Sequence, residues 1–446
     1  MNYDEALKFI HDTSKYGSKL GLQNITELLK RLGNPHKSFP SVHVAGTNGK
    51  GSVSAMTASI LHQAGYKTGL FISPYLERFT ERIQVDFKEI PKEALAELIG
   101  RIKYEIDGMF EDGFNHPTEF ELVTALGFLW FARQEVDIAV IEVGLGGRLD
   151  ATNVITPVVS IITSISFDHT RILGNSLSEI AYEKGGIIKP GVPLVSYPQP
   201  PEAEKVLKGL AEERGCPYYF VAAEQVIEKN ASFNEQHFDF AWKDKRFTDL
   251  IIRLPGRHQQ LNAACALSGI MILKESGFDI PDQAVYAGLE KARWPGRLEK
   301  VMDKPFILLD GAHNPAGAAA LAETVKQYFY GKKVHLILGI LQDKDAETVA
   351  KILCSIADSV SVTRSSSPRS ILPDELAAVA GKYHADVRIC DTLEKAISYG
   401  LEWARDDMKD EKHRNGKMLV ISGSLYLIGE ARQIIRRINK EQKMES

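Results

Sequence analysis

Cysteine is scarce in this chain of 446 residues, and membrane-length apolar runs and low-complexity tracts are missing from it. The four cysteines, Cys216, Cys265, Cys354 and Cys390, show no C-x-x-C or zinc-finger spacing. This argues against a disulfide framework or a cysteine metal site and fits reduced thiols. The N-terminus also lacks the apolar core of a signal peptide. We therefore expect a cytoplasmic protein with no membrane partner.

The chain also lacks a strong excess of charge of either sign, since its net charge is -4 with 25% charged and 44% hydrophobic residues. Such a composition is typical of a folded globular protein and argues against disorder or a general affinity for nucleic acid. Any anionic ligand must therefore be bound by locally gathered Lys and Arg side chains.

Apolar strand-like runs alternate with helix-period segments almost throughout the chain, a pattern typical of α/β proteins with helix-covered parallel sheets. The strands predicted in the first half are residues 41–45, 68–72, 137–143 and 157–165. Those predicted in the second half are residues 305–310, 334–339, 359–363, 387–391 and 418–422. A β-rich stretch around residues 216–249 is expected to form a small antiparallel addition to the first half.

The turn at Pro295-Gly296 is the predicted boundary between two domains, because the strand-helix rhythm restarts after it. The domains expected are residues 1–296 and 297–446. A chain of this length is also too long for one ordinary hydrophobic core.

The stretch "GTNGKGS", from Gly46 to Ser52, has the parts of a phosphate-binding loop between a strand and a helix. The G-x-x-x-x-G-K-[ST] spacing does not fit it, because Val44 and Gly51 stand at the first glycine and at the hydroxyl position. Glycines nevertheless let backbone amides face a phosphate, Lys50 adds a positive charge, and the Ser52 hydroxyl can bind Mg²⁺. The alternative is a glycine-rich turn of no special purpose.

Glu142 lies near the end of a run apolar enough to be a buried strand. An unpaired carboxylate there is costly, and ligands of open α/β sheets gather at these strand ends, so a magnesium ion is the natural partner. The alternative is that Arg148 or a helix terminus satisfies Glu142.

The next strand places Asp168 and His169 at the same sheet edge. A neutral imidazole can bind a metal, although a lone loop histidine usually does not. Taken alone, Lys184 in "YEKGGIIKPG" is predicted to be a solvated charge on a helix.

Two turns of the second half carry polar groups between a strand and a helix. "LLDGAHNPAG" supplies Asp310, His313 and Asn314 before a helix that starts near Pro315. "VISGSLYLIG" supplies Ser424 at another helix N-terminus, which suits a carboxylate. The alternative is that both are ordinary strand-to-helix turns.

Together these stretches resemble folylpolyglutamate synthase, including its bifunctional dihydrofolate synthase form, in the Mur ligase superfamily of ATP-dependent amide ligases. The resemblance covers nearly the whole chain and is carried, in family order, by "GTNGKGS", "SPYLERFTERI", "EVGLGGRLDATN", "DHTRILGNSLSEIAYEKGGI", "LPGRHQQLNAACAL", "WPGRLE" and "DGAHNPAG". It implies a P-loop parallel-sheet ATPase domain followed by a smaller Rossmann-like α/β domain, with the active site in the cleft between them.

The resemblance also implies roles for individual residues. ATP is assigned to Asn48, Gly49, Lys50, Gly51, Ser52, Asn262, Arg297 and Asp310. Magnesium is assigned to Ser52, Ser73, Glu142 and His169. The pteridine-bearing substrate is assigned to Lys19, Leu20, Gly21, Leu22, Thr118, Glu119, Phe120, Glu121, Leu149, Asp150 and Ala151. The incoming glutamate is placed near His313 and Ser424. Lys184 matches a carbamylated lysine that serves a second Mg²⁺, which replaces the expectation of a solvated charge.

The implied reaction begins with transfer of a phosphoryl group from ATP to a carboxylate of dihydropteroate or of a folate. The amine of L-glutamate attacks the acyl phosphate, and ADP and phosphate leave. Lys50, Lys184 and His313 are the residues implied in catalysis, and His313 is the only suggestion for the base. Tyr75 departs from the His found there in many family members, which leaves one substrate contact undefined. We expect a monomer.

Three other functions are less consistent with the sequence. A Mur peptidoglycan amino-acid ligase would carry a UDP-sugar-binding domain, for which the 45 residues before the loop are too few. An ATP-binding regulatory protein without ligase activity would not need the anion sites of the second half. An NAD-dependent oxidoreductase is disfavoured because no predicted strand is followed by G-x-G-x-x-G and a helix.

Overall fold

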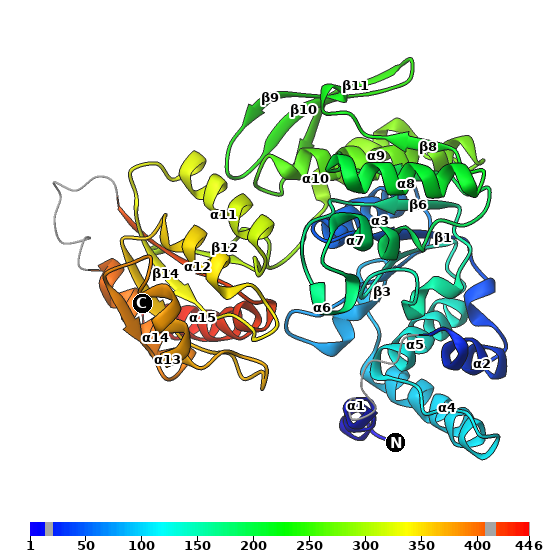
Figure 1. Ribbon diagram of the computed structural model, residues 1–446, viewed down its shortest axis with the longest axis horizontal. Coiled ribbons are helices and arrows are strands. Elements are labelled where there is room, and N and C mark those ends of the chain that lie inside the picture. Colours follow the sequence, from blue (N-terminus) through cyan, green and yellow to red (C-terminus); the bar gives the residue numbers. More distant parts are fainter. Residues whose placement is uncertain (14–20, 406–415, 446) are drawn as a thin grey trace.

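The computed structural model describes residues 1–13, 21–405 and 416–445 of the chain. Two large sheets with helices on both faces account for most of them, as Figure 1 shows. The α/β architecture predicted from the alternation of strands and helical segments is therefore confirmed.

The first sheet has eight strands in the order β4-β3-β2-β5-β1-β6-β7-β8. Their bounds are β1 Ser41–Ala45, β2 Thr68–Phe71, β3 Ile83–Val85, β4 Lys88–Glu89, β5 Ile138–Glu142, β6 Val159–Ile162, β7 Leu194–Ser196 and β8 Tyr218–Phe220. The six strands from β2 to β8 in this order are parallel. Four of them, β2, β5, β1 and β6, were predicted, whereas β7 was missed and β8 was expected in an antiparallel unit.

The β3–β4 edge of this sheet is antiparallel, which the sequence did not predict. Asp86 and Phe87, the two residues between these strands, both have positive φ, at 51° and 59°. Two successive residues of positive φ form the tight turn that closes a hairpin. The usual Asn-Gly or Asp-Gly signal is missing here, so the hairpin was not recognisable.

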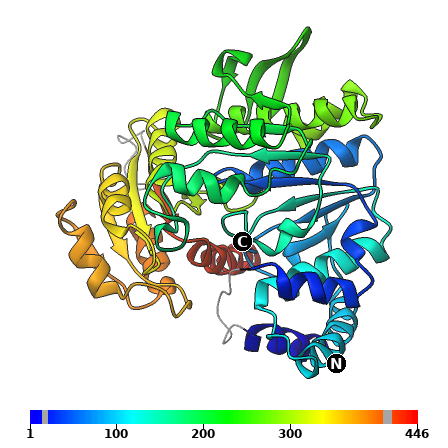
Figure 2. The same ribbon diagram turned by 45° about the vertical axis from the view of Figure 1, so that its right-hand side comes forward.

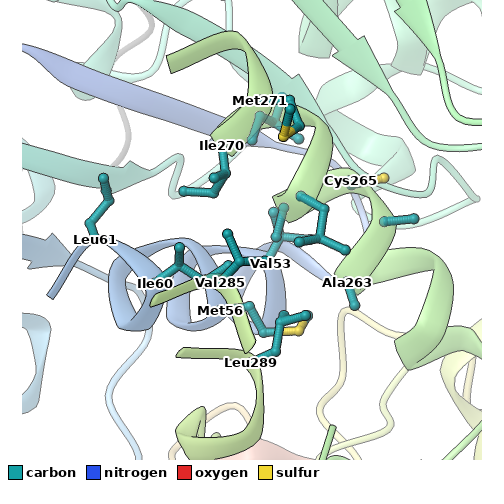
Figure 3. Close-up of a cluster of buried hydrophobic side chains, with 14 of the residues drawn as sticks. Val53, Met56, Ile60, Leu61, Ala263, Cys265, Ile270, Met271, Val285 and Leu289 are labelled. Atoms are coloured by element: carbon teal, nitrogen blue, oxygen red, sulfur yellow. The ribbon is translucent and has the colours of Figure 1, made fainter. Parts of the chain in front are cut away.

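The helices of this half cover both faces of the sheet. Their bounds are α1 Tyr3–Asp12, α2 Gln23–Arg31, α3 Lys50–Gln63, α4 Lys92–Glu111, α5 Glu119–Arg133, α6 Thr170–Leu173, α7 Leu177–Gly185, α8 Pro201–Glu213, α9 His258–Glu275 and α10 Asp282–Lys291. Short 3₁₀ turns are η2 Pro35–Lys37, η3 Phe79–Arg82, η4 Ala151–Val154 and η5 Ala223–Gln225. Figure 3 shows α3 packed between α9 and α10 through residues such as Met56, Ile270 and Leu289. This packing fixes the helix that follows the glycine-rich loop.

A three-stranded antiparallel sheet lies beside α9, formed by β9 Val226–Ala231, β10 Gln236–Trp242 and β11 Lys245–Ile252. This confirms most of the antiparallel unit predicted around residues 216–249. The "YYF" segment is the exception, because β8 pairs in parallel with β7 as the last strand of the first sheet. The helix α8 between β7 and β8 makes this a crossover connection, which favours parallel pairing.

The second sheet has six strands in the order β12-β13-β17-β14-β15-β16, with β12 antiparallel to β13 and the others parallel. The strands are β12 Glu299–Asp303, β13 Phe306–Asp310, β14 Lys333–Leu338, β15 Ser359–Val362, β16 Val387–Ile389 and β17 Lys417–Ser422. The helices are α11 Pro315–Tyr328, α12 Ala346–Cys354, α13 Pro373–Ala380, α14 Leu393–Arg405 and α15 Leu425–Glu445. The five strands predicted for this half are confirmed, and β12 was missed.

The two sheets meet along α15, which Figure 2 shows in red between them. A Cβ at Gly429 would lie 2.1 Å from the carbonyl oxygen of Leu76, and Arg436 pairs with Glu77 at 2.9 Å. The predicted turn at Pro295-Gly296 lies between α10 and β12, so we retain the division into residues 1–296 and 297–446 as a prediction. No described helix combines the length and hydropathy needed to cross a membrane.

Candidate active site

The loop between β1 and α3 depends on its glycines. Gly46 has φ of 145°, and a Cβ there would lie 1.9 Å from Oγ1 of Thr163. Gly49 has φ of 94°, and its Cβ would lie 2.5 Å from Oδ1 of Asn262. Neither position accepts a larger residue without displacing its neighbour. No described side chain caps α3 at Gly49, so the first N–H groups of the helix remain available to an anion.

Lys50 begins α3 and folds back over the same loop. Its Nζ donates to the carbonyl oxygens of Gly46 at 3.1 Å and Thr47 at 3.2 Å. Burial lowers the pKa of Lys50, while the negative charges of Glu142 and Asp168 oppose this shift. The loop therefore holds a half-buried cation beside an uncapped helix N-terminus, which is the chemistry that binds phosphate.

Glu142 ends β5 and is only 3% exposed. Burial raises the pKa of Glu142 to about 7, against the opposing charge of Lys50, and its carboxylate accepts the N–H of Ser73 at 3.4 Å. Arg148 is not its partner, because Arg148 pairs with Glu183 at 2.8 Å. The alternative that Arg148 satisfies Glu142 is therefore wrong.

The surroundings of Glu142 fit a magnesium ion that is coordinated partly by the protein and partly by phosphate oxygens of a bound nucleotide. Within the described ranges, no group of three His, Cys, Asp or Glu side chains could hold a metal alone. The Ser73 Oγ is buried and has no hydrogen-bond partner among the described residues. A carboxylate, one or two hydroxyls and phosphate oxygens are a usual ligand set for Mg²⁺. Ser52, on the first turn of α3, is the other buried hydroxyl of this set.

Lys184 is 4% exposed on α7 and donates to the carbonyl oxygen of Gly46 at 2.8 Å. Burial lowers the pKa of Lys184 to about 7, and the charge of Lys50 adds to the shift. The expectation of a solvated lysine is therefore wrong. Whether the amine carries CO₂ stays a prediction.

A polar cluster joins the two halves of the chain around Asp168. The Nζ of Lys344 lies 2.6 Å from Oδ1 of Asp168, and Asn314 donates to Oδ2 at 3.2 Å. His313 Nε2 lies 3.4 Å from the same Oδ2. Asn314 and Asn48 exchange two hydrogen bonds of 3.0 and 3.2 Å. The cluster therefore ties the glycine-rich loop to the turn after β13.

The electrostatics of this cluster are those of a strongly held carboxylate. Burial alone would raise the pKa of Asp168, but the hydrogen bond and charge of His313, with His169 and Lys344, lower it well below its usual range. His169 lies 3.1 Å from the Lys344 ammonium group, and burial lowers the pKa of His169 to about 4. A neutral imidazole is the form that binds metals, although Lys344 is its contact here.

A cavity of about 230 Å³ lies between the two halves, and most of the residues assigned to ATP line it. These are Asn48, Gly49, Ser52, Asn262, Arg297 and Asp310. Asp310 accepts the N–H groups of Leu298 and Ala312, both at 2.9 Å. Gly51 faces a neighbouring cavity of about 320 Å³, where a Cβ would lie 2.2 Å from the ring of Trp294.

A larger cavity of about 570 Å³ adjoins this region, and most of the residues assigned to the pteridine and glutamate line it. They are Gly21, Thr118, Phe120, Glu121, Leu149, Asp150, Ala151, His313 and Ser424, together with Ser73 and His169. His313 lines this cavity and the smaller one between the halves. The two chambers therefore meet at His313.

Some assigned residues have structural partners. Asp150 accepts the N–H groups of Leu145 and Thr152 at 2.9 and 3.0 Å, so it shapes its own loop. Thr118 and Glu121 form the capping box of α5.

Two of the assigned residues that the structure describes, Glu119 and Leu22, do not line the cavity. Glu119 pairs with His11 at 3.6 Å, and Leu22 packs into the core cluster beside α2. Lys19 and Leu20 lie outside the described residues.

Sequence reasoning missed several cations of the larger cavity. Arg82, Arg148, Lys344 and Arg369 line it, as does Tyr426. Lys344 follows the predicted strand 334–339 at its carboxyl end, which is the position that could have identified it. Arg82 and Arg148 lie within quoted motifs, whereas Arg369 stands in a loop with no signal.

Comparison with known proteins matches both halves of the chain. The Mur ligase middle domain matches residues 44–269, and the Mur ligase glutamate ligase domain matches residues 296–425. The dihydrofolate synthase/folylpolyglutamate synthase of Bacillus subtilis (strain 168) is 38% identical, over 97% of this chain and 99% of the relative. The folylpolyglutamate synthase of Lacticaseibacillus casei is 36% identical, over 98% and 99%. The chain belongs to the dihydrofolate synthase/folylpolyglutamate synthase family of ligases.

Solved structures of the folylpolyglutamate synthase family agree with this fold. A Mycobacterium tuberculosis folylpolyglutamate synthase complexed with ADP superposes with a TM-score of 0.90 at 32% identity, covering 97% of this chain and 99% of that one. An FPGS-AMPPCP-folate complex gives a TM-score of 0.84 at 34% identity, covering the same 97% and 99%. The family and fold expected from the sequence motifs are confirmed.

Proposed function

We propose that this protein is an ATP-dependent ligase that joins L-glutamate to a carboxylate of folates, and also of dihydropteroate. Membership of the dihydrofolate synthase/folylpolyglutamate synthase family supports the reaction class. The observation that carries the proposal is the pair of chambers that meet at His313, one beside the glycine-rich loop and one lined by the substrate segments. Phosphoryl transfer and amide formation need two such sites in contact.

In the proposed reaction the smaller chamber holds ATP. The N–H groups at the start of α3 and the Lys50 ammonium group bind its phosphates, while Asn262, Arg297 and Asp310 bind the rest of the nucleotide. Phosphoryl transfer depends mainly on positioning and charge neutralisation, which a preorganised loop provides. Mg²⁺ bound by Ser52, Ser73 and Glu142 would neutralise phosphate charge.

The larger chamber holds the folate and the incoming glutamate. Its cations, Arg82, Arg148, Lys344 and Arg369, offer partners for the carboxylates of both substrates. His313, at the junction, is the candidate to accept the proton of the attacking amine. Its Nδ1 lies 2.8 Å from the carbonyl oxygen of Gly311, and its Nε2 faces Oδ2 of Asp168 at 3.4 Å, so Nε2 would have to give its proton to Asp168 before it could accept one from the amine.

The test of this proposal is the substrate dependence of ADP release. Purified protein with ATP and Mg²⁺ is expected to release ADP only when a folate or dihydropteroate and L-glutamate are both present. Release driven by a UDP-muramoyl substrate would favour the peptidoglycan ligase. Release independent of glutamate would favour an ATP-binding regulatory protein.

The variant Lys50→Ala tests whether the glycine-rich stretch is a phosphate-binding loop or a turn without function. Ligase activity is expected to fall by about 10²-fold or more, because preorganised electrostatic contacts are typically worth that much. The exposed Lys8 on α1 provides the matched control, since Lys8→Ala should retain activity. Near-normal turnover of Lys50→Ala would refute the phosphate assignment.

A further inference from the structure

The loop between β9 and β10 reaches from the first half of the chain into the core of the second. In Figure 1 this green ribbon extends toward the yellow helix α11. The ring of Phe233 at its tip lies 5.0 Å from that of Phe329, 5.7 Å from that of Phe306 and 6.3 Å from that of Tyr328, between centroids. All other members of the hydrophobic cluster that it joins lie beyond residue 297.

The turn at the tip of this ribbon, which carries Phe233, is held by its own hydrogen bonds. The N–H of Ser232 donates to the carbonyl oxygen of Glu235 at 2.8 Å, and the Ser232 Oγ accepts the N–H of Glu235 at 3.1 Å. Arg253 holds the Glu235 carboxylate from β11's end at 2.9 Å. A turn fixed by its own hydrogen bonds loses little further freedom when Phe233 is bound by its partners.

The first residue of β10, next to this turn, is hydrogen-bonded to the start of α9. Gln236 is fully buried, and its Nε2 donates to the carbonyl oxygens of Leu254 at 2.6 Å and Gly256 at 3.0 Å. Gln260 of α9 donates to Oε1 of Gln236 at 3.0 Å. The same end of α9 supplies Asn262 to the cavity of about 230 Å³.

The opposite wall of that cavity is α11, the helix that ends at the Phe233 contact. Ala316, Gly317 and Ala320 of α11 line the cavity, while Tyr328 ends the helix. The ribbon therefore bridges, outside the cavity, the two helices that form its walls. Phe233 does not line the cavity itself, so any effect on a nucleotide would pass through the separation of α9 and α11.

We propose that Phe233 is a positioning residue that fixes the separation of α9 and α11, and with it the width of the nucleotide cavity. This inference rests on the proposed function, because it takes ATP to bind there. Packing of aromatic rings favours one arrangement of the two halves, and preorganised walls bind a ligand more tightly than walls that must be brought together.

The experiment compares Phe233→Ala with Tyr330→Ala, an aromatic residue of the same region that is 94% exposed. Phe233→Ala is expected to raise the KM for ATP and the Kd for ADP by about tenfold, which corresponds to about 1.4 kcal/mol. The KM values for folate and glutamate should change little. Phe233→Leu, which keeps an apolar side chain, should restore most of the affinity, and Tyr330→Ala should behave as wild type.

Two results would overturn the inference. One is an unchanged Kd for ADP in folded Phe233→Ala. The other is an equal rise in the KM of all three substrates with a lowered Tm, which indicates general destabilisation. If Phe233→Ala does not fold, Phe233→Leu must itself show a measurable rise in the Kd for ADP that Tyr330→Ala lacks, or the inference fails. ADP binding is measured without turnover, so loss of the proposed ligase activity in the wild type would be a separate result.

Discussion

At the scale of residues, three ionisable side chains gather around one short loop: Lys184 and Glu142 are buried, and Lys50 is half-buried. Lys50 and Lys184 both donate to the carbonyl oxygen of Gly46, and Glu142 lies at the end of the neighbouring strand. Burying charge is costly unless it is paired, and the pKa values of all three are shifted toward the neutral form. Such clusters of perturbed groups are typical of functional sites.

Glu142→Gln tests the magnesium assignment, because it keeps the shape of the side chain and removes its charge. Wild-type turnover should require Mg²⁺ and stop when EDTA is added. The variant should need about tenfold more Mg²⁺ for half-maximal activity, or fail to reach it. Glu93→Gln, an exposed position on α4, is the matched control. A variant with the wild-type magnesium titration would show that Glu142 has only a structural role.

Carbamylation of Lys184 should depend on pH. CO₂ reacts with the neutral amine, and burial lowers the pKa of Lys184 to about 7, so the reactive form predominates above that pH and is lost below it. In isotope-labelled bicarbonate, a carbamate signal in the carbon NMR spectrum is expected to grow from about pH 6 to about pH 8. The signal should be missing from Lys184→Arg. A wild-type spectrum without it at the higher pH would exclude the modification under these conditions.

At the scale of elements, the sequence predicted the parallel strands other than β7 and β8, because each is a continuous apolar run followed by a helical pattern. The hairpin β3–β4 was not predictable, since Asp86 and Phe87 adopt positive φ without the glycine that signals it. The strand β12 was missed because its sequence, "EKVMD", has few apolar residues and pairs only at the sheet edge. Edge strands are half exposed and carry weaker patterns.

The site shows the same division between local and tertiary information. Gly46, Lys50 and Glu142 belong to short motifs whose chemistry is visible in sequence. Lys344 gains its role only because β14 brings it to Asp168, which is 176 residues away. Asp150 was assigned to the substrate from its motif. In the structure its carboxylate oxygens accept hydrogen bonds from backbone N–H groups of its own loop.

At the scale of the whole molecule, the proposed chemistry depends on contacts between the two halves. The cluster around Asp168 joins them at the site, α15 joins them beside Glu77, and Phe233 joins them outside the cavity of about 230 Å³. These contacts place the glycine-rich loop opposite the turn that carries His313. All of these residues belong to one chain, so the site needs no second subunit, and the monomeric state stays a prediction.

Glutamate ligation to a folate can be tested by mass spectrometry of the products. The protein is incubated with ATP, Mg²⁺, L-glutamate and either a reduced folate or dihydropteroate, with reactions lacking one component as controls. We expect a product heavier by one glutamyl residue, formed only in the complete mixture and matched by release of ADP and phosphate. A complete mixture that leaves every pterin substrate at its original mass would contradict it.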